Sequence, residues 1–407
     1  MRNIICGDAN TNIISGGAGD DVIYGIGGAN FLYGGLGNDT FIGKLTENDF
    51  IDGESGNDKV DYSNLLAANS IRVNLGTTTT RNDEQGISQT VYEISKIGGH
   101  SDYVKNISIF EGSAGNDTFT VGAGNYTFIG GAGDDTFNGS NFKDVLIDGG
   151  LHINGDYVDY SSVADKIIIS LQDGSDPTTV RVSGDTTNHT IKNIENIIGS
   201  NTADDTIIGN SSNNTIIGGG GDDTIDGAGG NNYLDGGSHI SGDTVSFESV
   251  TSVNGISVNI GNSVVTINGT SYLAQSSIRN GLTSTVVNFE NIQGSKNADI
   301  LIGSDEANII NAGLGNDTIY GGKGSNSLNG DAGADKFIMG GFFDGTTTDY
   351  AYVNKVDGGS GADILDYSKV TTGAISVTLY GAEFSTVSIY SDNVSIVTGK
   401  QIGRAHV

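Results

Sequence analysis

A nine-residue unit of the form Gly-Gly-x-Gly-x-Asp-x-apolar-x recurs along this chain, most clearly at residues 16–24, 34–42, 130–138, 218–226 and 358–366. Its glycine- and aspartate-rich first six residues favour a tight turn, and its last three favour a very short strand. A unit this short cannot bury its apolar residue alone, but stacked copies can. The repeat therefore predicts an all-β solenoid, a flattened coil in which two units complete one turn.

One large apolar residue per unit is expected to point inward and form a continuous row. The row is predicted to consist of Ile23, Leu32, Phe41, Phe119, Phe128, Phe137, Leu146, Ile207, Ile216, Ile225, Leu234, Leu301, Ile310, Ile319, Leu328 and Phe337.

The sixth position of the unit alternates between Asp and Asn, so residues eighteen apart carry the same side chain. The alternation runs through Asn12, Asp21, Asn30, Asp39, Asn48 and Asp58, through Asp205, Asn214, Asp223 and Asn232, and through Asp299, Asn308, Asp317, Asn326 and Asp335. It predicts a coil with Asp on one edge and Asn on the other. The second block departs from this pattern, because it reads Asp117, Tyr126, Asp135 and Asp144.

Carboxylates and backbone carbonyls are the oxygen ligands that calcium prefers, whereas Asn offers a neutral oxygen and can also donate to turn backbone. We therefore expect calcium between successive Asp turns, about eight or nine ions in all. The alternative, that Asp and Asn are equivalent turn formers, stays open at this point. The predicted metal-site residues are Asp21, Asp39, Asp58, Asp117, Asp135, Asp156, Asp205, Asp223, Asp243, Asp299, Asp317, Asp335 and Asp363, with Gly17, Gly19, Gly35, Gly37, Gly131, Gly133, Gly219, Gly221, Gly313 and Gly315 in the turns.

With these repeats the chain resembles the RTX (repeats-in-toxin) family, whose nonapeptides fold as a calcium-binding parallel β-roll. The resemblance implies calcium as the cofactor and an extracellular or cell-surface location. It also implies export by the type I secretion machinery of a Gram-negative bacterium.

The repeats fall into four blocks separated by segments rich in β-branched residues, which we expect to form β-rich inserts. We predict repeat blocks at 1–63, 112–161, 199–247 and 294–368, and inserts at 64–111, 162–198, 248–293 and 369–401. Residues 402–407 read as a translated sequencing adapter, and we expect the natural chain to continue beyond both ends.

Each block ends in a similar short sequence, here called the closing phrase, at Lys59–Ser63, Tyr157–Ser161, Thr244–Glu248 and Ile364–Ser368. The first three inserts also end in similar sequences, here called re-entry phrases, at Asn106–Ser113, Asn193–Ser200 and Asn288–Ser295. His152 and His239 occupy equivalent two-residue insertions, where we expect them to decorate a loop because no partner is visible in the sequence. The single Cys6 excludes an internal disulfide.

The net charge of −30 argues against a nucleic-acid partner, since no basic stripe could meet phosphate, and no apolar run is long enough to span a membrane. Stacked carboxylates repel strongly unless a cation lies between them, so the acidity is interpreted as calcium sites. Neither a His-Glu-x-x-His nor a Gly-x-Ser-x-Gly motif is present. We therefore expect no enzymatic activity.

Three functions are compatible with these features. The favoured one is a non-enzymatic, calcium-stabilised array in a large secreted adhesin or surface protein, because long inserts would be superfluous in a simple carboxy-terminal tail. The alternatives are the repeat region of a secreted exoenzyme, such as a protease, lipase or epimerase, and that of a pore-forming toxin. The expected partners are calcium and a cell-surface carbohydrate or protein, which would contact the inserts.

Overall fold

The computed structural model describes residues 1–122, 124–174, 176–183, 188–250, 254–339, 355–366, 375–379, 386–388 and 394–398. Within these ranges all regular structure is β-strand, which confirms the predicted fold class, and no helix is long and apolar enough to cross a membrane. The chain divides into two compact units, Met1–Ala203 and Asp204–Val407, and this boundary coincides with none of the predicted domain limits. The expected adapter residues 402–407 lie outside the described residues.

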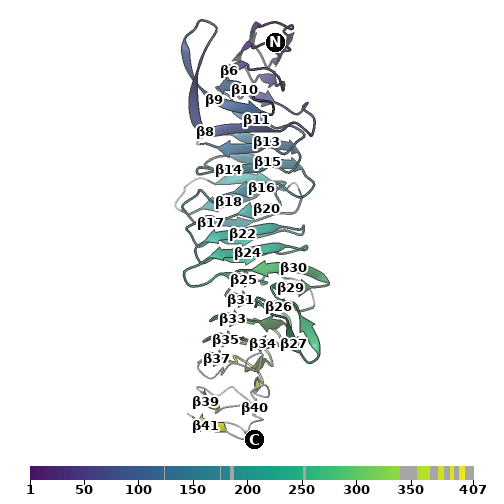
Figure 1. The fold of residues 1–407 in the computed structure, drawn as a ribbon, viewed down its shortest axis with the longest axis vertical. Helices are drawn as coiled ribbons and strands as arrows, with labels where there is room; N and C mark the ends of the chain where they lie inside the picture. The colour runs from purple at the N-terminus through teal and green to yellow at the C-terminus, as the bar shows by residue number, and fades with distance from the viewer. Residues whose placement is uncertain are drawn as a thin grey trace. The chain divides into compact units, whose positions relative to one another are not determined.

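Unit 1 is a flattened coil whose strands alternate between two faces, with successive rungs stacked in parallel, as Figure 1 shows for β13 to β16. Face A consists, in spatial order, of β1 (Ile4–Cys6), β3 (Val22–Tyr24), β5 (Thr40–Ile42), β7 (Lys59–Asp61), β11 (Ile109–Glu111), β13 (Thr127–Ala132), β15 (Leu146–Leu151), β19 (His189–Lys192), β18 (Thr178–Val182) and β17 (Ile167–Ser170). Face B consists of β2 (Ile13–Ala18), β4 (Phe31–Leu36), β6 (Phe50–Ser55), β10 (His100–Lys105), β9 (Ser88–Lys96), β8 (Ile71–Asn82), β12 (Thr118–Val121), β14 (Thr136–Gly139), β16 (Tyr157–Asp159) and β20 (Asn196–Ile198).

Unit 2 repeats this architecture. Face C consists of β21 (Thr206–Ile208), β23 (Thr224–Asp226), β25 (Thr244–Ser246), β31 (Asn291–Gln293), β33 (Ile309–Asn311), β35 (Ser327–Asn329) and β37 (Lys355–Asp357). Face D consists of β22 (Thr215–Gly220), β24 (Tyr233–Ser238), β30 (Leu282–Val287), β29 (Ser276–Arg279), β26 (Ser257–Asn259), β32 (Ile300–Ile302), β34 (Thr318–Tyr320), β36 (Lys336–Ile338), β38 (Ile364–Asp366) and β40 (Thr386–Ser388). Two further pairs are β27 (Val265–Ile267) with β28 (Thr270–Tyr272), and β39 (Ile375–Leu379) with β41 (Val394–Thr398).

The inserts are spliced into the stack as antiparallel strands on one face. In the first insert, β10 pairs in parallel with β6, β9 and β8 follow in antiparallel order, and β8 pairs in parallel with β12. The third insert joins β24 to β32 through β30, β29 and β26 in the same way. On the opposite face the closing strand pairs directly with the re-entry strand, as in β7–β11, β16–β20 and β25–β31. An insert therefore widens one face without interrupting the other.

The predicted apolar row forms the core. Each of its members is at most 1% exposed, except Leu146, which is only partly buried while its neighbour Ile147 is fully buried. The expectation for Leu146 is wrong because this rung is nineteen residues from the one before it, so that Phe128 pairs with Ile147. Stacked rings continue from rung to rung, with Phe119 and Phe137 at a centroid distance of 4.9 Å. Such contacts add to the burial of apolar surface that stabilises each rung on the next.

Candidate functional site

The Asp side chains of the repeat form a buried ladder along the edges of the coil. All of the predicted Asp ligands are at most 1% exposed. Within a block, each Asp donates its backbone N–H to Oδ1 of the Asp in the following Asp turn. The N···Oδ1 distances are 2.7 Å for Asp21–Asp39, 2.8 Å for Asp39–Asp58, 2.7 Å for Asp117–Asp135 and Asp135–Asp156, 2.6 Å for Asp205–Asp223, 2.7 Å for Asp223–Asp243 and Asp299–Asp317, 2.8 Å for Asp317–Asp335 and 3.0 Å for Asp335–Asp363.

The second carboxylate oxygen of most ladder residues has no hydrogen-bond donor although it is buried. Buried charged oxygens are costly unless a donor or a cation meets them. These oxygens are Oδ2 of Asp21, Asp39, Asp58, Asp135, Asp156, Asp223, Asp243, Asp317 and Asp335.

Backbone carbonyls converge on the same places. A Cβ built on Gly34 would lie less than 3.0 Å from Oδ2 of Asp39 and from the carbonyl oxygen of Gly53 in the next rung. The same combination recurs at Gly16, Gly130, Gly218 and Gly330. The carboxylate of one turn and a carbonyl of the next therefore face one small volume.

The glycines predicted in the turns are required by the backbone rather than by a ligand side chain. All ten have positive φ, from 92° at Gly17 to 134° at Gly315. At Gly37, a Cβ would also collide with the carbonyl of Gly19 in the preceding turn. Only glycine satisfies both conditions, and its absence of a side chain lets successive turns stack closely.

The Asn turns are satisfied without a cation. Asn232 accepts the N–H of Asn214 at 2.8 Å through Oδ1, as a ladder Asp would, but its Nδ2 donates to the carbonyls of Gly227 and Gly229 at 2.8 and 2.7 Å. A Cβ on Gly227 would meet this Nδ2 where a Cβ on Gly218 would meet Oδ2 of Asp223. Asn326 likewise donates to turn carbonyls, whereas in the turns of Asn214 and Asn308 the side-chain oxygen faces the glycine and accepts the N–H of Asn210 or Ser304.

The Asp edges fit calcium. Calcium takes six to eight oxygens, typically carboxylates and carbonyls, and each Asp turn supplies both kinds. Among the residues described by the structure, no cluster of three or more His, Cys, Asp or Glu side chains could hold a metal. An ion here would therefore depend on backbone carbonyls, which suits a hard cation and disfavours zinc or copper.

The Asp ladder changes edge within each unit, which corrects the expectation of one Asp edge throughout. In unit 1, Asp21, Asp39 and Asp58 lie in turns leading from face B to face A, whereas Asp117, Asp135 and Asp156 lie in turns leading from A to B. In unit 2, Asp205, Asp223 and Asp243 precede strands of face C, whereas Asp299, Asp317 and Asp335 precede strands of face D. The re-entry strand β11 returns to the face of β7 without an Asp turn before it, and the next turn, which leads to the other face, carries Asp117.

Two further sequence assignments on the Asn edge are wrong. Asn30 donates its N–H to Asp49 rather than Asn48, at 2.7 Å, because that rung is one residue longer. Asp144 is exposed and lies outside the ladder, since Tyr126 stands opposite Val145.

The first Asp of a block after an insert differs from the others. Asp117 accepts N–H groups from Ile71 and Ser113 and the hydroxyl of Ser113, and Asp299 accepts the corresponding groups of Ile256 and Ser295. These two carboxylates are thus saturated by protein donors, and each anchors the first strand of the preceding insert.

His152 and His239 have partners that the sequence did not reveal. His152 Nε2 lies 3.2 Å from Oε1 of Glu195, and His239 Nε2 lies 3.2 Å from Oε1 of Glu290. Each Glu belongs to a re-entry phrase some 40 to 50 residues downstream. The matching His-x-x-x-Asp and Asn-x-Glu-Asn spacings in two blocks were the only available signal.

A second group of buried charges lies at the first insert. Lys96 Nζ is 2.7 Å from Oδ1 of Asp102, and the hydroxyl of Tyr62 donates to Oδ2 of Asp102 at 2.5 Å. Burial raises the pKa of the nearby Glu47 to about 7 and that of Asp49 to about 6. Lys96 pairs with Asp102 and offsets part of this charge, whereas Oε2 of Glu47 is buried without a hydrogen-bond partner.

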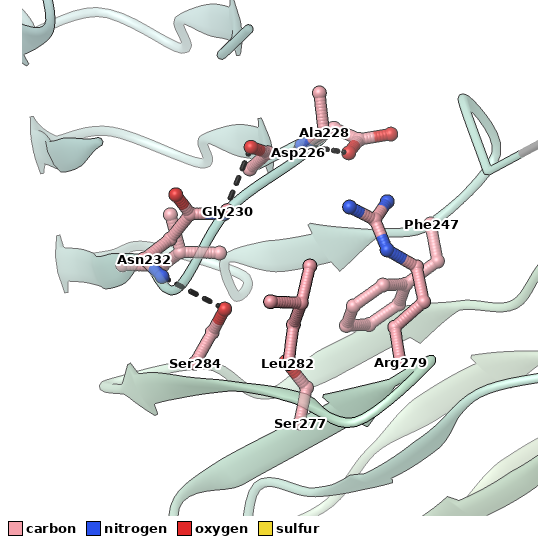
Figure 2. Close-up of a pocket in the computed structure, with 11 residues that line it drawn as sticks. Asp226, Ala228, Gly230, Asn232, Phe247, Ser277, Arg279, Leu282 and Ser284 are labelled. Atoms are coloured by element: carbon pink, nitrogen blue, oxygen red, sulfur yellow. Dashed lines mark hydrogen bonds between the residues drawn. The ribbon is translucent and has the colours of Figure 1, made fainter. Parts of the chain in front are cut away.

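In the third insert the strand registers place Arg279, Ser284 and Phe247 at the positions of Lys96, Asp102 and Tyr62. Figure 2 shows Arg279 alongside Phe247, with Ser284 accepting the N–H of Asn232 at 2.9 Å. The cavity left there has a volume of ≈ 20 Å³, room for about one water molecule. It is too small for an organic substrate.

Burial raises the pKa of several ladder carboxyl groups. Burial raises the pKa of Asp135 to about 8, and the charges of Asp117 and Asp156 add to this effect. Burial likewise raises the pKa of Asp156, Asp223 and Asp317 to about 7 and of Asp58 and Asp243 to about 6. A cation between the turns would oppose both causes.

Comparison with known families agrees with this geometry. The family model for the RTX calcium-binding nonapeptide repeat matches residues 7–41, 45–64, 111–146 and 200–237, and three overlapping matches cover 289–319, 302–337 and 311–344. No curated protein matches the sequence. The matched segments contain ten of the thirteen ladder Asp residues, and Asp156, Asp243 and Asp363 lie outside them.

The two kinds of turn are expected to differ in calcium binding. Replacing Asp223 with Ala removes an open oxygen, so calorimetric titration should show a loss of about one or two ions. The matched change Asn232→Ala should leave the stoichiometry unchanged, because Asn232 binds only protein groups. Equal losses in both variants would contradict a calcium role restricted to Asp turns.

Without calcium, stability should increase as the pH falls. The folded-state pKa of Asp135, about 8, lies above the value in the unfolded chain. At pH values between the two, the folded chain therefore binds more protons than the unfolded chain. The stabilisation is therefore complete below about pH 4 and is lost as the pH rises through the folded-state values up to about 8. Circular dichroism of calcium-free protein should show more β structure at pH 5 than at pH 8, with a smaller difference in Asp135→Asn. An equal or weaker β signal at pH 5 would refute this assignment.

Proposed function

Since the chain belongs to the RTX calcium-binding nonapeptide repeat family, we propose that it is a non-enzymatic calcium-folded β-roll region of a large secreted bacterial protein, an adhesin or surface-associated protein. The observation that supports this best is the contrast between the two kinds of turn. Buried Asp oxygens lack donors, whereas the Asn amides satisfy their own turns.

Calcium between successive Asp turns would number about eight or nine ions. Each ion would take carboxylate oxygen from one turn and carbonyl oxygen from the next, and would screen the repulsion between neighbouring carboxylates. Because the ladder changes edge within each unit, both edges of each unit would carry calcium, each along part of its length.

Secretion through a type I system fits this chemistry. Extracellular calcium modules bind with dissociation constants of about 10⁻⁴–10⁻³ M. A cytosol poor in calcium would keep the chain loosely folded during export, and calcium outside the cell would then fold it. The net charge of −30 would further oppose premature collapse.

The inserts are the parts that we propose contact a cell-surface carbohydrate or protein. The first insert projects the exposed end of the β8–β9 hairpin, and its Arg81 guanidinium stacks over Tyr103 at 4.7 Å from the ring centroid. Tyr92 and Tyr272 are partly exposed, whereas Tyr350 lies outside the described residues. Such aromatic and Thr-rich surfaces suit recognition without catalysis.

Folding should depend on calcium. In chelator at pH 8 the carboxylates repel and their oxygens lack partners, so circular dichroism should show mostly disorder, and adding calcium to millimolar concentration should restore the β signal. Magnesium at the same concentration is the control, since its preference for rigid octahedral sites suits these turns poorly. A fully folded spectrum in chelator would refute the proposal.

The purified chain should turn over no substrate. Esterase, protease, glycosidase and uronate-epimerase assays at millimolar calcium provide the measurement, because these activities correspond to the exoenzyme alternative. The adhesin proposal would be wrong, and the chain would be an enzyme, if turnover were reproducible and were abolished by a single substitution outside the Asp ladder.

A further inference from the structure

Each of the three junctions at which an insert rejoins the stack begins with an Asn in the left-handed region. These are Asn106 (φ 54°), Asn193 (φ 52°) and Asn288 (φ 57°). Asn tolerates this conformation better than most residues, though it remains uncommon outside glycine. The same backbone geometry at three equivalent places indicates a common role.

The side chain of each junction Asn is held by an Asp from the preceding rung. Asn106 Nδ2 donates to Asp52 Oδ1 at 2.8 Å, Asn193 to Asp148 at 2.6 Å and Asn288 to Asp235 at 2.7 Å. These Asp residues immediately precede Gly53, Gly149 and Gly236, which open the last Asp turn of each block. The bonds fix the Asn, and with it the direction of its carbonyl.

The carbonyl of the junction Asn occupies the place of a repeat glycine carbonyl. A Cβ on Gly149 would lie less than 3.0 Å from both the Asn193 carbonyl oxygen and Oδ2 of Asp156. Within the block, a Cβ on Gly130 would meet the Gly149 carbonyl and Oδ2 of Asp135 in the same way.

The other two junctions repeat this arrangement. Gly53 faces the Asn106 carbonyl and Oδ2 of Asp58, and Gly236 faces the Asn288 carbonyl and Oδ2 of Asp243. Asp58, Asp156 and Asp243 are fully buried, and their Oδ2 atoms have no donor. The last turn of each block thus has the oxygen pair of an interior turn, although no nonapeptide follows it.

The re-entry segment also continues the ladder. The N–H of Asp156 donates to Oε2 of Glu195 at 3.0 Å, and that of Asp243 to Oε2 of Glu290 at 2.9 Å, where an interior turn would present an Asp. In the first junction Ser108 takes this place, and no His insertion accompanies it. In all three junctions the carbonyl of the last Asp accepts two successive backbone N–H groups of the re-entry segment.

We propose that each junction binds a calcium ion between the last Asp turn of a block and the re-entry segment. The ligands would be Asp58 with the Asn106 carbonyl, Asp156 with the Asn193 carbonyl, and Asp243 with the Asn288 carbonyl. The inference rests on the proposed calcium role of the Asp turns and adds sites outside the nonapeptide repeat. Each ion closes a loop of roughly 40 residues, the whole insert, for which the chain-entropy cost is substantial.

The ion therefore ties the return of each insert to its block, so that the insert acquires its final pairing only when calcium is present. The second and third junctions, with Glu195 and Glu290 nearby, carry one carboxylate more than the first and bind calcium more tightly. Asp52, Asp148 and Asp235 act as positioning residues, since they hold the Asn and have no direct part in the oxygen pair.

The test compares two triple variants of the full chain. In one, Asn106, Asn193 and Asn288 are changed to Ala, which disfavours positive φ and turns the carbonyls away. In the control all three are changed to Gly, which loses the same side-chain bonds but retains the backbone conformation. Calcium bound at saturation is counted by equilibrium dialysis. The Ala variant should bind about three ions fewer than the wild type, and the Gly variant should bind nearly as many as the wild type.

An unchanged calcium count in a folded Ala variant would overturn the junction sites while leaving the interior sites standing. A wild-type chain that binds no calcium would instead refute the proposed function. Should the Ala variant fail to fold, hydrogen exchange on the wild type decides. The amides of Ser108, Glu195 and Glu290 should become protected at the calcium concentrations that protect the amides of Asp39, Asp135 and Asp223. The junction calcium sites would be excluded if calcium left the exchange rates of the junction amides unchanged while it protected the interior amides.

Discussion

The structure depends on a carboxylate with two different oxygens. Within a block, one oxygen of each Asp after the first accepts the backbone N–H of the previous Asp turn, which fixes the stacking of the turns. The other oxygen of most of these Asp residues is buried without a donor. In water both oxygens would be solvated, so stacking the turns leaves a row of buried charges that only protons or cations relieve. The acidity of the chain, the glycines and the need for an ion all follow from this arrangement.

The Asn turns have the same backbone but carry no buried negative charge that a proton or cation must neutralise. In the turns of Asn232 and Asn326 the ladder bond through Oδ1 is kept, but the amide nitrogen replaces the second oxygen and donates to turn carbonyls. We therefore expect an Asn edge to depend less on ions than an Asp edge. An edge made of Asp throughout would add cost to the metal-free state, whereas alternation confines the repulsion to one edge per block. The insert then moves the ion-dependent ladder to the other edge, so neither edge carries a single long row of negative charge.

Much of this architecture could be predicted from spacing alone. A nine-residue step fixes which residues face inward, and Phe119, Phe128 and Phe137 lie where the period places them. The errors occurred where a rung is one residue longer, because one extra residue in a strand or turn moves every later side chain to a new register. Asp49 replaces Asn48 and Ile147 replaces Leu146 for this reason. Partners such as His152 and Glu195, or Lys96 and Asp102, could not be found from the period, because they depend on how an insert returns to the stack.

The inserts show why a solenoid of such short units tolerates long interruptions. Each insert adds strands to one face only, and the closing strand on the other face still pairs with the re-entry strand. Within each unit, the hydrogen bonding of the stack therefore continues past the insert in the described residues. At the edge, an Asn with positive φ supplies the carbonyl that a glycine would have supplied. What the stack requires at each rung is thus a strand in register and a few correctly directed polar groups, and a sequence that provides them needs no nonapeptide motif. This is why a family motif detects the blocks but leaves the inserts unmatched, although both belong to the same coil.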